Sequence, residues 1–167
     1  PPHVALIVRA QVKTDKKAAI TLAQLHAAGL LPGVWIPPVE VREARALVAH
    51  RRKMVRLSSI AKCRLHALLH SRDIELPEGF EPFSEEMRPW WQALPLTPLE
   101  KHCLRSNLET LDFARQQVRE AEAALNELAA RDDRTPLLIQ VPGIGVLTAV
   151  TILAAIGTIE RFPDARH

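Results

Sequence analysis

The sequence predicts a mainly α-helical protein. Of its 167 residues 47% are hydrophobic, yet only 4% are aromatic and Tyr is absent, so a core has to form mainly from Leu, Ala, Val and Ile, which favours helices. Two long segments lack Gly and Pro and repeat apolar residues at helical spacing. We expect two long helices forming a coiled-coil or helical hairpin module, with a short α/β remnant before them and a helix-hairpin-helix-like element after them.

The N-terminal segment, residues 1–38, is the expected α/β remnant. Its first apolar run, residues 4–8, fits a short strand. A helical pattern follows, with Asp15 suited to the N-cap and Gly29 to the position after the C-cap. Prolines then predict extended chain, with residues 34–36 as a second short strand.

The middle segment, residues 39–134, contains both predicted long helices. The first begins at Val39 and meets no Gly or Pro before Pro77, which predicts a helix of roughly 45 to 50 Å. A proline-rich connector with two adjacent tryptophans follows, and we expect short helical turns there, with the tryptophans anchoring the loop rather than stacking on nucleic-acid bases.

The second long helix is predicted from about Pro98 to Arg131. Its apolar residues recur every seven positions, with a second stripe of Ala and Leu beside them, which is typical of a coiled coil: Leu104, Leu111, Val118, Leu125 and Ala114, Ala121, Leu128. The two long helices can fold back on each other within one chain or cross to a second copy, and a homodimer is one of the two expectations.

Positive charge gathers on the first long helix. Between Arg42 and Arg72 nine residues are basic and Glu43 is the only acid, which gives this stretch a charge of about +8. Such a concentration is typical of a surface that binds a polyanion. We predict nucleic-acid contacts by the following residues: Arg45, Arg51, Arg52, Lys53, Arg56, Lys62 and Arg64.

The segment 135–167 contains the pattern Val-Pro-Gly-Ile-Gly followed by an apolar run up to Gly157. This predicts a tight turn that leads into a buried helix. Gly143 and Gly145 allow close backbone approach, and the amide groups at a helix N-terminus favour a phosphate. The same pattern also fits a simple connection between two helices.

Other chemistry has weaker support in the sequence. Cys63, His66 and His70 share one face of a helix in a spacing that suits zinc, but the only candidates for a fourth ligand are His102 or Cys103, if the two helices pair. The two cysteines indicate no disulfide framework, so we expect a reduced, cytoplasmic setting. No apolar run is long enough to predict a membrane span.

Three segments, in order along the chain, resemble insertion-sequence transposases that have a RuvC-like DEDD nuclease domain, a coiled-coil middle and a C-terminal transposase domain. Residues 12–19 (VKTDKKAA) resemble that family's Lys-x-Asp-x-x-Asp-Ala segment, residues 51–69 resemble its basic long helix, and residues 141–163 resemble the start of its C-terminal domain. The resemblance implies a DNA transposase or recombinase that acts on transposon-end DNA, in some members guided by an RNA.

The resemblance also implies a catalytic site. Asp15 corresponds to one of four carboxylates that hold a divalent metal, expected to be Mg²⁺, while Ala18 stands where the family has a second Asp. We expect the other two carboxylates before Pro1 and a serine nucleophile after His167, so that this chain alone neither holds Mg²⁺ stably nor cleaves DNA. The alternative function is a non-enzymatic module for nucleic-acid binding and oligomerisation.

Overall fold

The computed structural model describes residues 14–31 and 35–162, and every regular element in these two ranges is helical. The predicted mainly α-helical class is therefore confirmed. The strand expected at residues 4–8 lies outside the described residues. The strand expected at residues 34–36 is wrong for Trp35 and Ile36, which have no regular secondary structure and precede the first residue of a long helix by only a few positions.

The chain divides into two compact units, residues 1–37 and 38–167. The first contains α2 (Asp15–Ala27), whose N-cap is Thr14 and not Asp15: the Thr14 hydroxyl accepts a hydrogen bond of 3.3 Å from the Lys17 amide. Asp15 occupies the first turn, where a carboxylate is also favourable. Gly29 ends the helix as predicted, with φ of +68°.

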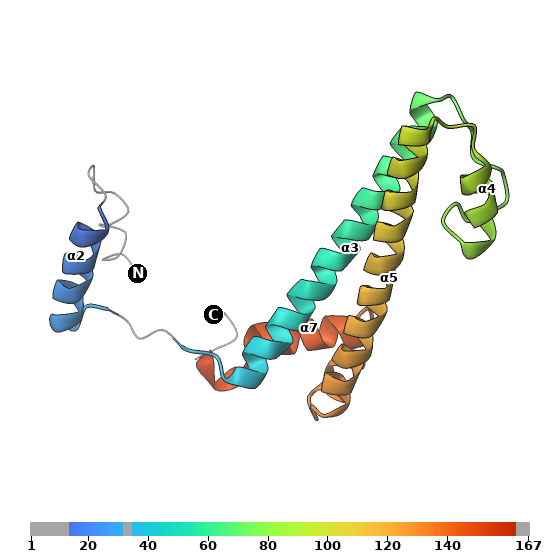
Figure 1. Ribbon diagram of the computed structural model, residues 1–167. Coiled ribbons are helices and arrows are strands. Elements are labelled where there is room, and N and C mark those ends of the chain that lie inside the picture. Colours follow the sequence, from blue (N-terminus) through green and yellow to red (C-terminus); the bar gives the residue numbers. More distant parts are fainter. Residues whose placement is uncertain (1–13, 32–34, 163–167) are drawn as a thin grey trace. The chain divides into compact units, whose positions relative to one another are not determined.

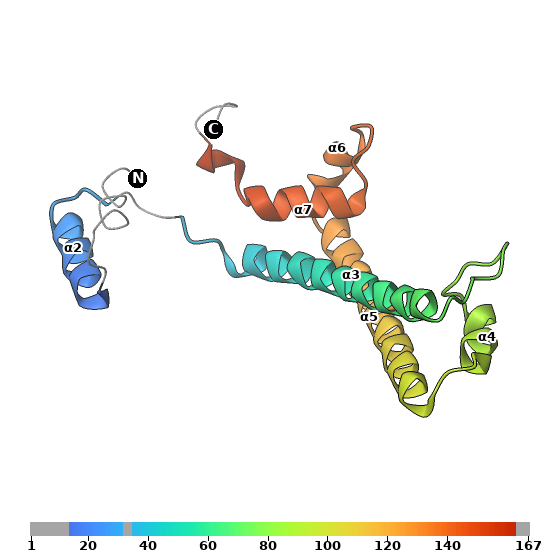
Figure 2. The same ribbon diagram turned by 90° about the horizontal axis from the view of Figure 1, so that it is seen from above.

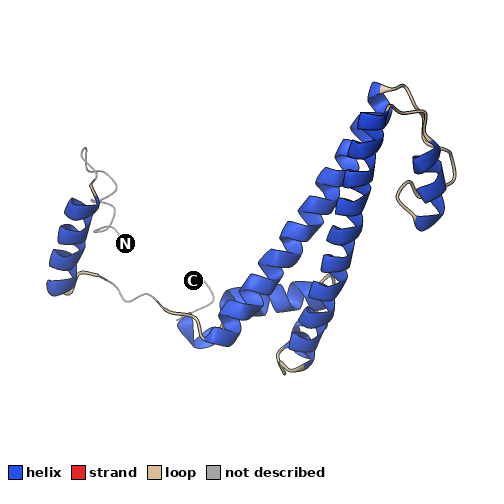
Figure 3. Cartoon of the chain, viewed as in Figure 1, coloured by secondary structure: helices blue, strands red, loops and turns tan. Residues whose placement is uncertain are grey.

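The second unit is built around α3 (Val39–Ser71) and α5 (Pro98–Ala130), each of 33 residues. They lie side by side and run in opposite directions (Figures 1 and 3), and seen from above they cross at an angle (Figure 2). At about 1.5 Å per residue each extends roughly 50 Å. Ala61 and Leu65 of α3 pack against Leu108 and Leu111 of α5 in one buried cluster.

The connector between the long helices packs onto this cluster. It contains η1 (Glu85–Met87) and α4 (Arg88–Ala93), so short helical turns form where they were predicted. Trp91 is fully buried, donates a hydrogen bond of 2.7 Å from Nε1 to the Pro82 carbonyl, and stacks on Phe83. It therefore anchors the connector.

The remaining helices lie at the end of the α3–α5 pair that is opposite the connector. They are α6 (Thr135–Ile139), α7 (Val146–Ile156) and the single turn η2 (Ile159–Arg161). Val150 of α7 joins Leu125 and Ala129 of α5 in a second buried cluster, with Leu47 and Val48 of α3 against it. Figures 1 and 2 both show α7 beside the N-terminal part of α3 and the C-terminal part of α5.

Candidate nucleic-acid interface

Four of the predicted nucleic-acid-binding residues share the solvent side of α3. Arg52, Lys53, Arg56 and Arg64 are all exposed. At about 100° per residue they fall within an arc of roughly 120° on the helix. The buried residues of α3, such as Ala61 and Leu65, lie on the other side and pack toward α5. We call these four residues the basic face.

The basic face has no paired counter-charge among the described residues. None of its four side chains forms a hydrogen bond or ion pair with another residue in ranges 14–31 and 35–162. Elsewhere arginines pair with carboxylates, as Arg88 does with Asp112. Uncompensated guanidinium and ammonium groups on a rigid helix are available to phosphate oxygens.

Arg45 and Arg51, two further predicted contacts, have partners inside the protein. Arg51 donates from Nε (2.9 Å) and Nη2 (2.6 Å) to the Glu122 carboxylate on α5. Arg45 donates to the carbonyl oxygens of Ala154 (2.6 Å) and Ala155 (2.9 Å) at the end of α7. Both hold helices together, which the sequence pattern could not reveal because each partner is distant along the chain.

Lys62, the last predicted contact on α3, lies toward α5. It is half-buried, and its Nζ is 5.4 Å from the centre of the Phe83 ring. It lines a groove between α3 and α5 together with Ser58, Ser59 and two arginines of α5, Arg115 and Arg119. Arg115 and Arg119 were not among the predicted nucleic-acid contacts. Their spacing of four residues around Val118 puts all three on one helix face, and this was the available signal.

Gly143 and Gly145 form the turn before α7. Gly143 has φ of +88°, a conformation that favours glycine, and both glycines are exposed. Gly145 is the N-cap of α7, and its backbone is extended at φ −89° and ψ 175°. No side chain caps this helix start, so amide groups of its first turn remain for water or an anion.

The described residues do not fit a metal centre. Asp15 is exposed in the first turn of α2, and the residue one turn further along the same face is Ala18, which has no ligand atom. Cys63, His66 and His70 are exposed on α3, and no three His, Cys, Asp or Glu side chains come together as a ligand group in the described part of the chain.

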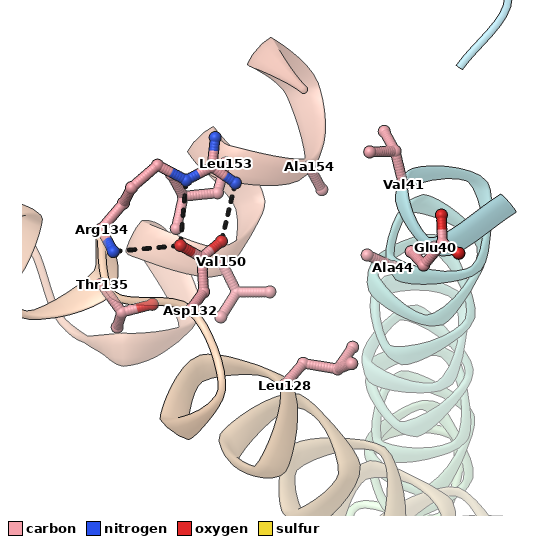
Figure 4. A pocket seen from close by; sticks show the side chains of 10 residues that line it. All are labelled: Glu40, Val41, Ala44, Leu128, Asp132, Arg134, Thr135, Val150, Leu153 and Ala154. Atoms are coloured by element: carbon pink, nitrogen blue, oxygen red, sulfur yellow. Dashed lines mark hydrogen bonds and ion pairs between the residues drawn. The ribbon is translucent and has the colours of Figure 1, made fainter. Parts of the chain in front are cut away.

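A small pocket of about 160 Å³ lies where α3, α5 and α7 meet (Figure 4). At one side Asp132 accepts two hydrogen bonds from the Arg134 guanidinium (2.9 and 2.7 Å) and one from the Arg134 amide (3.0 Å). These bonds hold the pKa of the Asp132 carboxyl below its usual range. Arg134 also donates to the Gly157 carbonyl (2.7 Å), so the pair joins the end of α5 to the end of α7.

Comparisons with known proteins bear on the segment that contains α6, the glycine turn and α7. A family model described as Transposase IS116/IS110/IS902 family matches residues 135–167. The whole chain is also 26% identical over 172 aligned residues to the transposase for insertion sequence element IS1111A of Coxiella burnetii. The resemblance to insertion-sequence transposases is confirmed.

A second relative matches a shorter part of the chain. It is the insertion element IS110 uncharacterized 43.6 kDa protein of Streptomyces coelicolor, 36% identical over 58 residues. These two alignments cover 100% and 35% of this chain, but 46% and 14% of the respective relatives. The chain thus spans about half the length of the first relative, and its alignment with the second covers a much smaller share of that protein. No solved structure matches the chain, and no described helix combines the length and apolar character needed to cross a membrane.

Proposed function

We propose that this chain is part of a DNA transposase and that it holds nucleic acid on the basic face of α3. The observation that carries the proposal is the set Arg52, Lys53, Arg56 and Arg64, which is exposed, shares one arc of the helix and has no carboxylate partner among the described residues. When these side chains neutralise phosphates of a nucleic acid, the counterions condensed on those phosphates are released to the solvent, and this drives binding.

The partner we propose is transposon-end DNA, with a guide RNA as a further partner in the intact protein. Both are phosphate polymers, so the same cations serve either one. A helix about 50 Å long offers an extended contact surface. The apolar start of α7, with Gly143 and Gly145 before it, is a secondary candidate contact.

We also propose a homodimer through the long helices. Phe113 on α5 is 56% exposed, so apolar surface remains outside the intramolecular cluster and away from the basic face of α3. A second copy of the chain would bury it. Sedimentation of the chain and of Phe113→Lys tests this: the dimer proposal predicts a concentration-dependent dimer that the charged variant dissociates.

We propose that the intact protein, of which this chain is a part, cleaves DNA in the cytoplasm. We propose that strand cleavage there depends on Mg²⁺ and that this chain by itself does not cleave DNA, because Asp15 is followed on its helix face by Ala18. Nicking of supercoiled DNA by the purified chain in the presence of Mg²⁺ is the opposing result. Binding without nicking by this chain is expected both of the transposase proposal and of the alternative function, a nucleic-acid-binding and oligomerisation module, and Mg²⁺-dependent cleavage by the intact protein separates the two.

Binding is tested by replacing two cations of the basic face. Arg52→Gln with Arg56→Gln should weaken binding of a duplex DNA about tenfold or more at moderate salt, because each charge-assisted contact contributes roughly 1 kcal/mol or more. The salt slope should also fall by about 0.9 for each lost phosphate contact. The matched control, Lys101→Gln with Arg105→Gln on α5, removes the same charge elsewhere and should bind like the parent.

The two free cysteines supply an independent footprint. Cys63 is exposed on α3, in the same arc as the basic face, and Cys103 is exposed on α5. Bound DNA should slow alkylation of Cys63 and leave Cys103 reactive. Equal alkylation of both thiols with and without saturating DNA would place the binding surface elsewhere.

A further inference from the structure

A groove between α3 and α5 combines cations with hydroxyl groups. Its volume is about 410 Å³, and its lining is contributed by both long helices: Val55, Ser58, Ser59 and Lys62 from α3, and Arg115, Val118 and Arg119 from α5. No acidic residue is in this set. The groove lies beside the basic face, since Val55 and Ser59 are neighbours of Arg56 on α3.

The three cations of the groove have no carboxylate within ion-pair distance in the described ranges. Arg115 uses Nη1 for a hydrogen bond of 2.5 Å to the Phe83 carbonyl, and Arg119 donates from Nε to the neutral side chain of Gln116 (3.1 Å). The Lys62 ammonium group lies 5.4 Å from the centre of the Phe83 ring and forms no hydrogen bond or ion pair with a described residue. No carboxylate of the described residues therefore neutralises their charge.

A second pocket of the same unit differs from this groove, because acidic residues line it together with its cations. The pocket between α4 and α5 also contains three cations, but Glu109 and Asp112 line it with them, and Arg88 and Arg105 each form an ion pair there. Cations that face one another across two helices repel at close range. An anion that fills the space between them would explain why Lys62, Arg115 and Arg119 lie together without an acidic residue.

The hydroxyl groups favour a phosphate in particular. Ser58 is half-buried and its hydroxyl has no hydrogen-bond partner among the described residues, while Ser59 donates to the Val55 carbonyl (3.1 Å). Phosphate oxygens accept hydrogen bonds from hydroxyl, ammonium and guanidinium donors alike. Val55 and Val118 provide apolar surface of the kind that a sugar ring can contact.

We propose that this groove binds the phosphodiester backbone of a nucleic acid, as a second contact next to the basic face. The inference rests on the proposed function, because it presupposes nucleic-acid binding, but it adds a site on α5. From Val55 to Lys62 the groove follows α3 for about 10 Å. Measured along the axis of a duplex, this length covers about three steps of one strand at roughly 3.4 Å each.

The test compares three variants that each remove two positive charges. The groove variant is Lys62→Gln with Arg119→Gln, and Arg115 stays because it holds the connector. The face variant is Arg52→Gln with Arg56→Gln, and the control is Lys101→Gln with Arg105→Gln. Each is titrated against a 30-base-pair DNA duplex, the corresponding single-stranded DNA and a single-stranded RNA, over a range of salt concentrations.

The groove variant should bind about tenfold more weakly than the control, with the duplex salt slope reduced by about 1.8 for two lost phosphate contacts. Ser58→Ala should weaken binding about threefold without changing net charge, and it provides the test if the double variant does not fold. The probe with the largest loss identifies which nucleic acid occupies the groove.

Failure of the inference and failure of the proposed function give different results. If the parent chain binds none of the three probes, the proposed function itself is wrong. If the face variant loses affinity while the groove variant and Ser58→Ala bind like the control, the basic face binds nucleic acid and the groove does not.

Discussion

Arg45 of α3 donates a hydrogen bond of 2.6 Å from Nε to the carbonyl oxygen of Ala154, near the C-terminal end of α7. A second bond joins its Nη2 to the Ala155 carbonyl at 2.9 Å. The last carbonyls of a helix have no partner within the helix and carry partial negative charge, so a guanidinium there is favourable. This contact fixes α7, and with it the glycine turn, against the basic helix.

The first prediction concerns this contact. Arg45→Met keeps much of the aliphatic side chain but removes the donors, and should cost about 1 to 2 kcal/mol. Amide hydrogen exchange should accelerate in α7 and remain slow in the middle of α5. Arg42→Met, at an exposed position on the same helix, is the control. Unchanged exchange in α7 would show that its apolar contacts with Leu125 and Ala129 suffice.

The second prediction is a pH dependence at the junction of α5 and α6. The Arg134 guanidinium holds the pKa of Asp132 below its ordinary value, so the ionised carboxylate is stabilised by folding. That contribution is complete above about pH 3.8, the ordinary value, and is lost as the pH falls through the lower folded-state value.

Asp132→Asn should therefore lower the free energy of unfolding by about 1 kcal/mol at pH 7, because the pair is partly exposed, and by progressively less below pH 3.8. Chemical denaturation of both proteins at several pH values measures the difference. Asp133→Asn, at an exposed neighbouring position, should have little effect at any pH. A difference that grows on acidification would contradict the sign of the shift.

Periodicity and helix-ending residues located most of the elements. The two long helices were located by the apolar pattern after Val39, which contains no Gly or Pro, and by the proline before Leu99. Gly29 and Gly157 end α2 and α7 as expected. These signals are local, because they depend on φ preference and on residues three or four apart. The Asp15 N-cap was wrong since Thr14, also a good capping residue, precedes it.

The composition of the candidate site was less accessible to the sequence. The density of positive charge along the sequence identified α3 as the candidate helix. It did not show that Arg51 and Arg52, although adjacent, lie on different sides of that helix: Arg51 bonds to Glu122 of α5, whereas Arg52 is exposed to solvent. Arg119 joins the groove of Lys62 from a residue 57 positions away. Such contacts depend on how two helices pack, which one sequence read alone does not specify.

The third prediction concerns the connector. Trp91→Ala removes a fully buried indole and leaves the Pro82 carbonyl without its hydrogen bond, so it should cost about 3 to 5 kcal/mol. Trp91→Phe should cost less but remain measurable, since the carbonyl is still unpaired. Trp90→Phe, at a partly buried position, is the comparison. Urea unfolding measures all three, and equal effects at both tryptophans would contradict the anchoring role of Trp91.

The last prediction separates the two glycines of the turn. Gly143 has φ of +88°, where any side chain is strained, so Gly143→Ala should cost about 1 to 2 kcal/mol although no atom lies within 4 Å of the added Cβ. Gly145 has an ordinary φ of −89° and equally open surroundings, so Gly145→Ala should leave the free energy of unfolding nearly unchanged.

Because Gly145→Ala should not change stability, it tests binding separately from folding. If nucleic acid approaches the start of α7, the added methyl group should weaken binding in a fully folded protein. Unchanged affinity would restrict the contact to α3 and α5, and a large loss of stability in Gly145→Ala would contradict the described turn.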